Sequence, residues 1–219
     1  MKGTLMALGL LLLLAACDDP RQLATQDLPW VVESLADGGS RVFGVTLGES
    51  DLRTVAQTFR ALPEIALFRE ADGGLYLEAY FGRITLGVLE ARVIARLAAD
   101  EAQLAAMADR APSSEPMPSG ARKLGLTEAD IRSVYDLPVG ALTYIPTAQY
   151  DAAIVEQRFG PPAETLRLNT TQTYWLYPDK GLALLLGEEE REVLEYVPPR
   201  DFPALRERLQ QTIAGDTAA

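Results

Sequence analysis

Hydrophobic residues along this 219-residue chain recur at two different spacings, and the spacing changes at clusters of proline and glycine. Apolar residues three or four positions apart predict amphipathic helices, whereas alternation of apolar and polar residues predicts half-buried strands. The first spacing predicts helices over 50–60, over 91–109, after Thr127, from 147 or 149 to Phe159, and after Asp201. The second predicts strands over 41–46, 65–68, 75–81, 84–89, 142–145, 165–168, 173–177, 182–186 and 192–197.

Short turns connect most of these strands. Asp72-Gly73-Gly74 and Pro178-Asp179-Lys180-Gly181 have turn composition, and glycine supplies the positive φ that tight hairpins need. Gly82-Arg83 is predicted to be another turn. Because parallel strands require long crossover connections, such short loops predict antiparallel meanders. The predicted fold class is therefore α+β.

Residues 111–122 are predicted to form an exposed, extended linker, because this Pro/Ser-rich segment has three prolines and no apolar periodicity. The linker divides the chain into a first α+β unit over 28–110 and a second over 123–214. The prediction is two helix-plus-antiparallel-meander units in tandem. The first also contains the long helix 91–109, and the second ends in a C-terminal helix.

Several residues recur at an offset of 100, and in both copies an extended segment, a helix, a proline stop and a meander follow one another. The matching pairs are Val45 and Ile145, Asp51 and Asp151, Val55 and Val155, Gln57 and Gln157, and Phe59 and Phe159. A tandem duplication explains these pairs. A single α+β domain whose halves happen to look alike is the alternative.

The second copy contains Val155, Phe159-Gly160-Pro161-Pro162, Tyr174-Trp175-Leu176-Tyr177 and Glu195-Tyr196-Val197. A helix that ends at Gly-Pro and is followed by an aromatic strand resembles the unit of the SmpA/OmlA (BamE-like) lipoproteins. It is also similar to the beta-lactamase inhibitor protein, which carries two such units. The first copy departs from this pattern, because Phe59 is not followed by Gly-Pro. The resemblance covers about a quarter of the chain well, and it implies a fold more directly than a function.

The N-terminal segment combines Lys2, an apolar run from Leu5 to Leu14, and Leu14-Ala15-Ala16-Cys17. This run is shorter than the roughly 20 residues of a membrane-spanning helix, and its layout is that of a secretory signal. The segment resembles a bacterial lipobox. This resemblance implies a signal peptide over 1–16, acyl chains on the Cys17 thiol, and a tether over 17–27. The alternatives are an ordinary cleaved signal and a buried first helix.

The resemblance to a lipobox implies a protein of the cell envelope that faces the periplasm and is anchored by lipid. In enteric lipoproteins an Asp after the cysteine marks retention in the inner membrane. Asp18 therefore favours the inner over the outer membrane by resemblance, although a merely solvating tether explains it equally well.

Composition narrows the possible functions. The net charge of −11 argues against nucleic acid as a partner, since nucleic-acid affinity depends on Lys and Arg neutralising phosphates. The chain contains no histidine and only one cysteine, so Ser-His-Asp devices, His-containing zinc sites and intramolecular disulfides are all impossible. No cofactor and no metal are expected.

Tyr174-Trp175-Leu176-Tyr177 is the densest aromatic cluster. Strand alternation places Trp175 and Tyr177 on one face. If this face is exposed, the two residues form a candidate partner-binding surface, since aromatic residues carry much of the energy of interfaces. The alternative is that a helix covers them.

Glu188-Glu189-Glu190-Arg191-Glu192 is the densest run of charge. Paired carboxylates could act as an acid and a base, or bind Ca2+. The interpretation favoured by the spacing is a solvated turn.

Three functions remain. The favoured one is a non-enzymatic, membrane-anchored lipoprotein that binds an envelope protein or scaffolds an envelope assembly. The others are a carboxylate-dependent enzyme acting on a cell-wall glycan, and a carrier of a small ligand or lipid.

Overall fold

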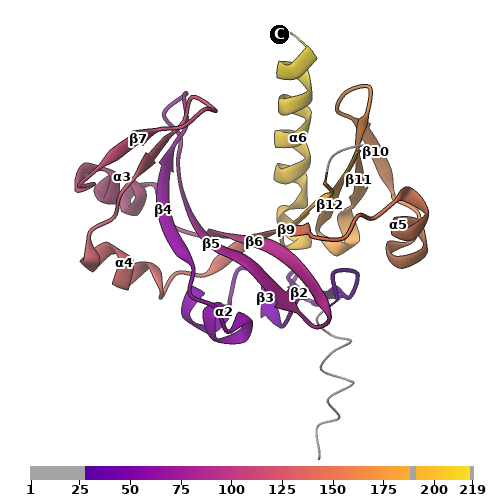
Figure 1. The fold of residues 1–219 in the computed structure, drawn as a ribbon, viewed down its shortest axis with the longest axis horizontal. Coiled ribbons are helices and arrows are strands. Elements are labelled where there is room, and N and C mark those ends of the chain that lie inside the picture. Colours follow the sequence, from indigo (N-terminus) through magenta and orange to yellow (C-terminus); the bar gives the residue numbers. More distant parts are fainter. Residues whose placement is uncertain (1–27, 188–190, 218–219) are drawn as a thin grey trace, which may run out of the picture.

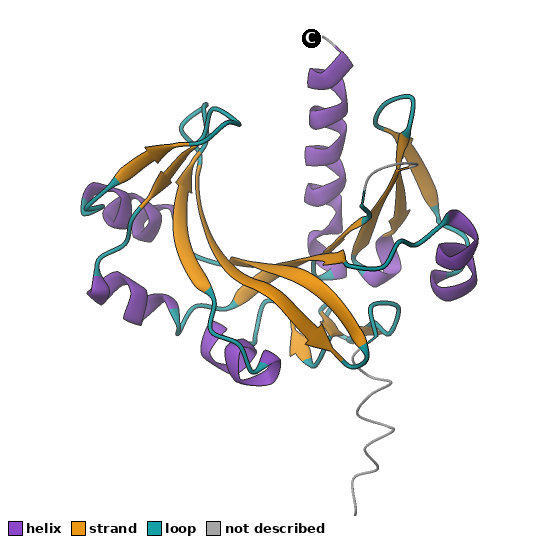
Figure 2. Ribbon diagram, in the orientation of Figure 1, coloured by secondary structure: helices purple, strands orange, loops and turns teal. Residues whose placement is uncertain are grey.

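The computed structural model describes residues 28–187 and 191–217, which form an α+β protein (Figure 1). Within these residues one ten-stranded antiparallel sheet, one three-stranded sheet and five α-helices are present (Figure 2). The predicted α+β class is confirmed. The signal segment 1–16, Cys17 and the tether 17–27 lie outside the described residues. No helix in the described part of the chain is long and apolar enough to cross a membrane.

The large sheet contains strands from both halves of the chain. In spatial order they are β10 (Glu164–Arg167), β11 (Gln172–Tyr177), β12 (Leu182–Gly187), β13 (Val193–Tyr196), β9 (Val139–Pro146), β6 (Leu89–Leu97), β5 (Leu75–Leu86), β4 (Glu64–Arg69), β8 (Arg122–Leu124) and β7 (Ser114–Pro116). The small sheet consists of β1 (Glu33–Ser34), β2 (Ser40–Val42) and β3 (Val45–Thr46). The helices are α2 (Leu52–Phe59), α3 (Glu101–Asp109), α4 (Glu128–Val134), α5 (Ala152–Phe159) and α6 (Phe202–Thr217).

The halves are joined where β6 pairs with β9, in a register that runs from Ala91 opposite Pro146 to Leu97 opposite Val139. The small sheet packs beneath this junction. Its Phe43 stacks on Tyr144 at 5.1 Å between ring centroids and meets Tyr196 edge-on at 5.7 Å. The two halves therefore share one sheet and one hydrophobic cluster.

The long helix predicted over 91–109 is wrong in its first half. Residues 89–97 are strand β6, and only Glu101–Asp109 is helical. Ala91, Val93, Ala95 and Leu97 are buried, while the residues between them are half-buried or exposed. This is the period of a strand, and long-range pairing with β5 and β9 overrides the helical propensity of the alanines.

The predicted turn at Gly82-Arg83 is also wrong. Strand β5 runs on to Leu86, and Gly82, at φ +68°, marks a shift of register opposite β6. A glycine at positive φ inside a strand is typical of a bulge. The chain reverses five residues later, at Gly87-Val88.

The predicted linker 111–122 is exposed, but it is not free of structure. It contains β7 and the start of β8, which form a hairpin on the edge of β4. Pro116 lies in β7, the outermost strand, where a missing amide proton breaks no ladder. The predicted boundary therefore does not separate two sheets.

Helices α2 and α5 occupy positions 100 residues apart and begin alike. The Asp51 carboxylate accepts a hydrogen bond from the Thr54 amide, and Asp151 accepts one from Ile154, each at 2.7 Å. The helix predicted over 50–60 therefore has Asp51 as its N-cap and Leu52 as its first residue. The apolar stripe predicted for α2 is confirmed, since Leu52, Val55 and Phe59 are buried in the core.

The large sheet is curved, with α2, α3, α4 and α5 on its convex side and α6 rising from its concave side (Figure 1). The core on the convex side is continuous and includes residues from α2, α3, α4 and α5. A second cluster lies between α6 and the concave side of the second half; its members are Leu176, Ala183, Val197, Phe202, Leu205 and Leu209.

Candidate functional site

One row of side chains crosses the concave face of the sheet from β4 to the edge strand β10. The strand registers place in this row Glu64, Tyr80, Ile94, Thr143, Glu195, Ala183, Leu176 and Glu164. Helix α6 packs on Ala183 and Leu176, which are 1% and 0% exposed. Tyr80, in the other half, is 40% exposed. One face of one sheet is thus buried in its second half and open in its first.

The open part is formed by β4, β5 and β6 and is named here the uncovered face. Its side chains are Ala66, Phe68, Tyr76, Glu78, Tyr80, Ile94 and Arg96, which oppose one another in the registers of the three strands. The Phe68 and Tyr76 rings stack at 5.3 Å, and the Arg96 guanidinium lies 4.0 Å from the centroid of Tyr76. Stacking and cation–π contact hold these side chains in place.

A hollow of about 200 Å³ opens on the uncovered face. Phe68, Tyr80 and Ile94 contribute apolar walls, and Met117, from the turn between β7 and β8, closes one side. Lys123 in β8 forms an ion pair with Glu64 at its rim. Apolar walls with charged groups at the rim are typical of a surface that receives a side chain of a partner.

Glu78 has the least exposed side chain among the charged residues of the two ion pairs on this surface. Its carboxylate lies 3.5 Å from the Arg96 guanidinium. Burial raises the pKa of Glu78, and the positive charge of Arg96 opposes this shift.

In the covered half, the same face is closed by α6. Phe202, Leu205 and Leu209 are each 3% exposed. Arg206 of α6 donates two hydrogen bonds to Glu164, both at 2.8 Å, and Arg208 pairs with Glu195. The Arg206 guanidinium lowers the pKa of Glu164. Carboxylates on this half are therefore paired with cations of the covering helix.

The structure does not support Tyr177 as part of an exposed partner-binding face. It is 5% exposed, its ring contacts Phe159 of α5, and its hydroxyl donates to the Gly160 carbonyl at 3.0 Å. Burial raises the pKa of Tyr177 to about 12. Trp175 points to the same side and is half-buried, and it lines a hollow together with Tyr150 and Glu192. The alternative, that a helix covers this face, holds for Tyr177.

The solvated-turn interpretation of the acidic run is wrong for its last residue. Glu188, Glu189 and Glu190 lie outside the described residues. Glu192 is 2% exposed. It turns inward because Arg191 is anchored to the surface, donating to the carbonyls of Pro146 and Thr147. Among the described residues no group of three or more His, Cys, Asp or Glu is placed to hold a metal ion.

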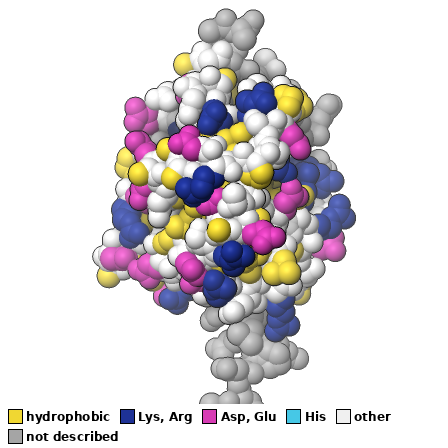
Figure 3. Space-filling model, turned by 90° about the vertical axis from the view of Figure 1, so that its left-hand side faces the viewer, with side chains coloured by type: hydrophobic (Ala, Val, Ile, Leu, Met, Phe, Trp, Pro, Cys, Tyr) yellow, Lys and Arg dark blue, Asp and Glu magenta, His cyan; other side chains and the backbone are white. Residues whose placement is uncertain are grey.

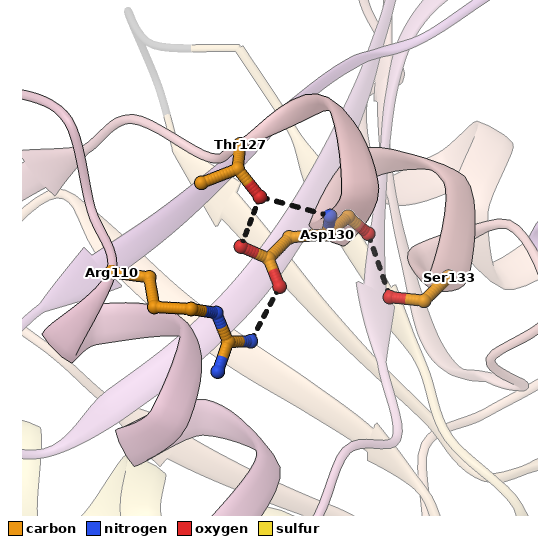
Figure 4. Close-up of polar contacts among 4 residues, drawn as sticks. All are labelled: Arg110, Thr127, Asp130 and Ser133. Carbon is orange, nitrogen blue, oxygen red and sulfur yellow. Dashed lines mark hydrogen bonds and ion pairs between the residues drawn. The ribbon is translucent and has the colours of Figure 1, made fainter.

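Asp130 is a buried carboxylate with a structural role. One of its oxygens accepts from Arg110 at 2.6 Å and the other from the Thr127 hydroxyl at 2.6 Å (Figure 4). Ser133 donates to the Asp130 backbone carbonyl. The hydrogen bond from Arg110 is the main cause of the lowered pKa of Asp130. Since both oxygens are occupied, this carboxylate joins the end of α3 to α4 and offers no free acid or base.

Charges of both signs are interspersed on the outer side of the molecule that carries α3 and β7 (Figure 3). No single-signed field dominates the visible side.

The pattern of the sequence contains a signal for the uncovered face, although the prediction missed it. Phe68, Tyr76 and Tyr80 stand at positions of one parity along β4 and β5, alternating with the core residues Leu67, Leu77 and Ala79. The signal is that the positions expected to be polar and solvent-exposed in these strands are occupied by aromatic residues. That α6 leaves this half open requires the tertiary structure.

Comparison of the chain with protein-family models, curated proteins and solved structures gives no significant match. The class that stands on the fold alone is an α+β protein with a curved antiparallel sheet. The function of the chain must therefore be inferred from its own residues.

Proposed function

We propose that this chain is a lipid-anchored, non-enzymatic protein of the bacterial cell envelope that binds a protein partner with its uncovered face. One observation carries the proposal: the same concave row is buried by α6 in one half and open in the other. An antiparallel sheet face lined by aromatic residues is usually covered in a folded protein. The partner takes, on the first half, the place that α6 takes on the second.

The composition of the uncovered face favours a protein as its occupant. Tyr76, Tyr80 and Arg96 belong to the residue types that dominate binding energy at interfaces. Glu64 and Lys123 place both signs of charge at the rim, which suits a polar protein surface and does not suit an anionic lipid headgroup or nucleic acid. Scaffolding of an envelope assembly would use the same kind of protein binding, with more than one partner.

Membrane attachment through Cys17 supports this role. The lipobox implies acyl chains on the Cys17 thiol, and the tether 17–27 separates them from the folded residues. Asp18 favours the inner membrane, with the folded part in the periplasm. Cys17→Ser is expected to move the protein from the membrane to the soluble periplasmic fraction. Retention of this variant in the membrane after a high-salt wash would contradict the anchor.

A tandem arrangement of two units, as in BamE-like lipoproteins and the beta-lactamase inhibitor protein, is part of the proposal. Its support is the offset of 100 between α2 and α5, which share an Asp cap and buried Val and Phe residues. Glu64 and Glu164 begin β4 and β10 at the same offset and stand at the two ends of the concave row.

A carboxylate-dependent enzyme acting on a cell-wall glycan is a second candidate, favoured by Glu78. Its raised pKa suits a general acid. Such an enzyme also needs a free carboxylate across the scissile bond, and Glu64 on the same face is paired with Lys123. The hollow of about 390 Å³ beside Trp175 includes Thr171, Thr173 and Glu192 in its lining, and these polar residues do not favour a lipid carrier.

The test compares two full-length variants in the native host. Tyr80→Arg places a bulky charge on the uncovered face, and Leu62→Arg, at a residue that is 85% exposed after α2, is the matched control. After purification from solubilised membranes, the wild-type protein and Leu62→Arg are expected to retain the same envelope protein. Tyr80→Arg should lose it at least tenfold with an unchanged melting temperature. Equal recovery with both variants would contradict the proposal.

A further inference from the structure

A second site lies on the opposite side of the sheet from the uncovered face. The space between the start of α5 and the ends of β11 and β12 holds a hollow of about 390 Å³. Trp175 and Thr173 of β11 line it, together with Tyr150 and Glu192. This hollow is named here the Trp175 pocket. Its residues play no part in the proposed protein-binding surface, so the two sites can be tested separately.

Glu192 gives the pocket an unusual chemical property. The residue is 2% exposed, and no described residue donates a hydrogen bond to its Oε2 atom. In the described part of the chain no Lys or Arg forms an ion pair with it, whereas Glu164, Glu195 and Asp130 each have an arginine. Buried carboxylates are normally paired or hydrogen-bonded, because removal from water disfavours the charge. A cationic ligand with N–H donors would supply both the opposite charge and the hydrogen bond that Glu192 lacks among the described residues.

Trp175 supplies a matching wall. Four aromatic rings of this protein already carry a cation from the chain itself: Trp30 from Arg158, Tyr76 from Arg96, Tyr135 from Arg53 and Tyr177 from Lys180. Among the described residues none of these contacts involves Trp175. Trp is the ring on which cations bind best. Trp175 and a carboxylate that no cation of the described residues pairs with thus line the same pocket.

The other lining groups are compatible with positive charge. Burial and the nearby Glu192 charge raise the pKa of Tyr150, so its phenol stays protonated and adds no competing charge. The positive end of α5 opposes a cation, and the Asp151 carboxylate at its cap offsets this. The Thr171 and Thr173 side chains line the same hollow and offer hydroxyl acceptors to further N–H groups.

We propose that the Trp175 pocket binds an organic cation, an alkylammonium or alkylguanidinium group. The cationic nitrogen donates to Glu192, and the cation lies against the Trp175 ring. No bond is made or broken, and no further component is required. The cation can be a small free amine or the side chain of a Lys or Arg in a polypeptide, because the recognised group is the same.

Calorimetric titration of the detergent-solubilised full-length protein tests the site. Butylguanidinium and butylammonium chloride are the probes, and 1-butanol is the uncharged control. The two cations are expected to bind, and butanol is not. Absence of cation binding, or equally strong binding of butanol, would overturn the proposal.

Three variants assign the interaction to atoms. Glu192→Gln keeps the shape and removes a buried unpaired charge, so it should fold with an unchanged or higher melting temperature and weaken cation binding at least tenfold. Trp175→Leu should weaken it about fivefold, as loss of a cation–π contact predicts. Glu195→Gln, on the opposite face beside Arg208, is the control and should bind as the wild type does. Unchanged affinity in Glu192→Gln would show that the carboxylate is not the recognition element.

A tripeptide with a central arginine and blocked ends identifies the source of the cation. Binding at least as tight as butylguanidinium supports a protein side chain as the natural ligand. Exclusion of the tripeptide while butylguanidinium binds supports a small free amine. A tripeptide in which norleucine replaces arginine is the control. Its binding as tightly as the arginine tripeptide would count against recognition of charge.

Discussion

The two halves of the concave sheet face differ in what lies on them. The row that begins at Glu64 and ends at Glu164 is continuous through the strand registers. From Glu195 to Glu164 it lies under α6. From Glu64 to Thr143 no helix of the described residues packs on it (Figure 1). Comparison of the two halves shows which contacts close one part of the sheet face and which contacts stabilise the open part.

The covered half is closed by apolar packing at its centre and by ion pairs at its borders. Phe202 and Leu205 fill the space over Leu176 and Ala183, and Arg206 and Arg208 reach the carboxylates of Glu164 and Glu195. On the uncovered half Arg96 and Lys123 belong to the sheet itself. The uncovered face is thus internally satisfied, and it can stay open until a partner covers its rings.

The largest expected effect is on the covered half. Phe202→Ala removes a ring that is 3% exposed at the base of α6, and it is expected to lower the free energy of unfolding by about 3–5 kcal/mol. Chemical denaturation followed by circular dichroism measures this loss. A loss below about 1 kcal/mol would mean that α6 is not held to the sheet by this packing.

A smaller effect, of opposite sign on the two halves, comes from two glutamates. The pKa of Glu164 is lowered by Arg206, so its stabilisation is complete above the usual value of 4.5 and is lost as the pH falls through the lower folded-state pKa. The pKa of Glu78 is raised by burial, so its contribution is complete below 4.5 and is lost as the pH rises through the raised folded-state pKa. Both side chains are partly solvated, which limits each effect to about 1 kcal/mol.

Unfolding free energies between about pH 3 and pH 6 therefore separate the two halves. As the pH rises, Glu164→Gln should fall further behind the wild-type protein. Glu78→Gln should gain on it over the same range. Parallel curves for the two variants would contradict the assignment of a paired and a desolvated carboxylate.

The smallest expected effect on stability is on the uncovered half. Tyr80→Ala removes a ring that is 40% exposed, so the free energy of unfolding should change by less than about 1 kcal/mol. Denaturation alongside Phe202→Ala gives the contrast directly. A loss as large as that of Phe202→Ala would show that Tyr80 is a core residue and that this half is not open.

Local patterns predicted the elements of the second half well. The strands around 173–177 and 182–186 and the turn between them are confirmed as β11 and β12, joined at Gly181. Here β-branched and aromatic residues, proline and glycine all favour the same structure. The helix after Asp201 is confirmed for the same reason, since Leu205 and Leu209 stand four residues apart on its buried side.

The errors arose where distant pairing decides the structure. Helical propensity and strand alternation compete over 91–97, and the two neighbouring strands β5 and β9 decide in favour of the strand. The same limit hid the joining of both halves into one sheet. The inward turn of Glu192 was missed because a run of five charged residues favours a solvated loop by composition alone.

Hydroxyl-radical footprinting of tyrosines tests whether a partner covers the uncovered face. Tyr80 and Tyr174 both lie on the concave face of the sheet, one in each half. The full-length protein is oxidised in native membranes and again in detergent after a stringent wash that removes co-purifying proteins. Tyr80 is expected to react readily in the washed protein and to be protected severalfold in membranes, while Tyr174, which packs against the α6 cluster, is expected to be protected equally in both. Equal reactivity of Tyr80 in membranes and in detergent would contradict a partner on the uncovered face.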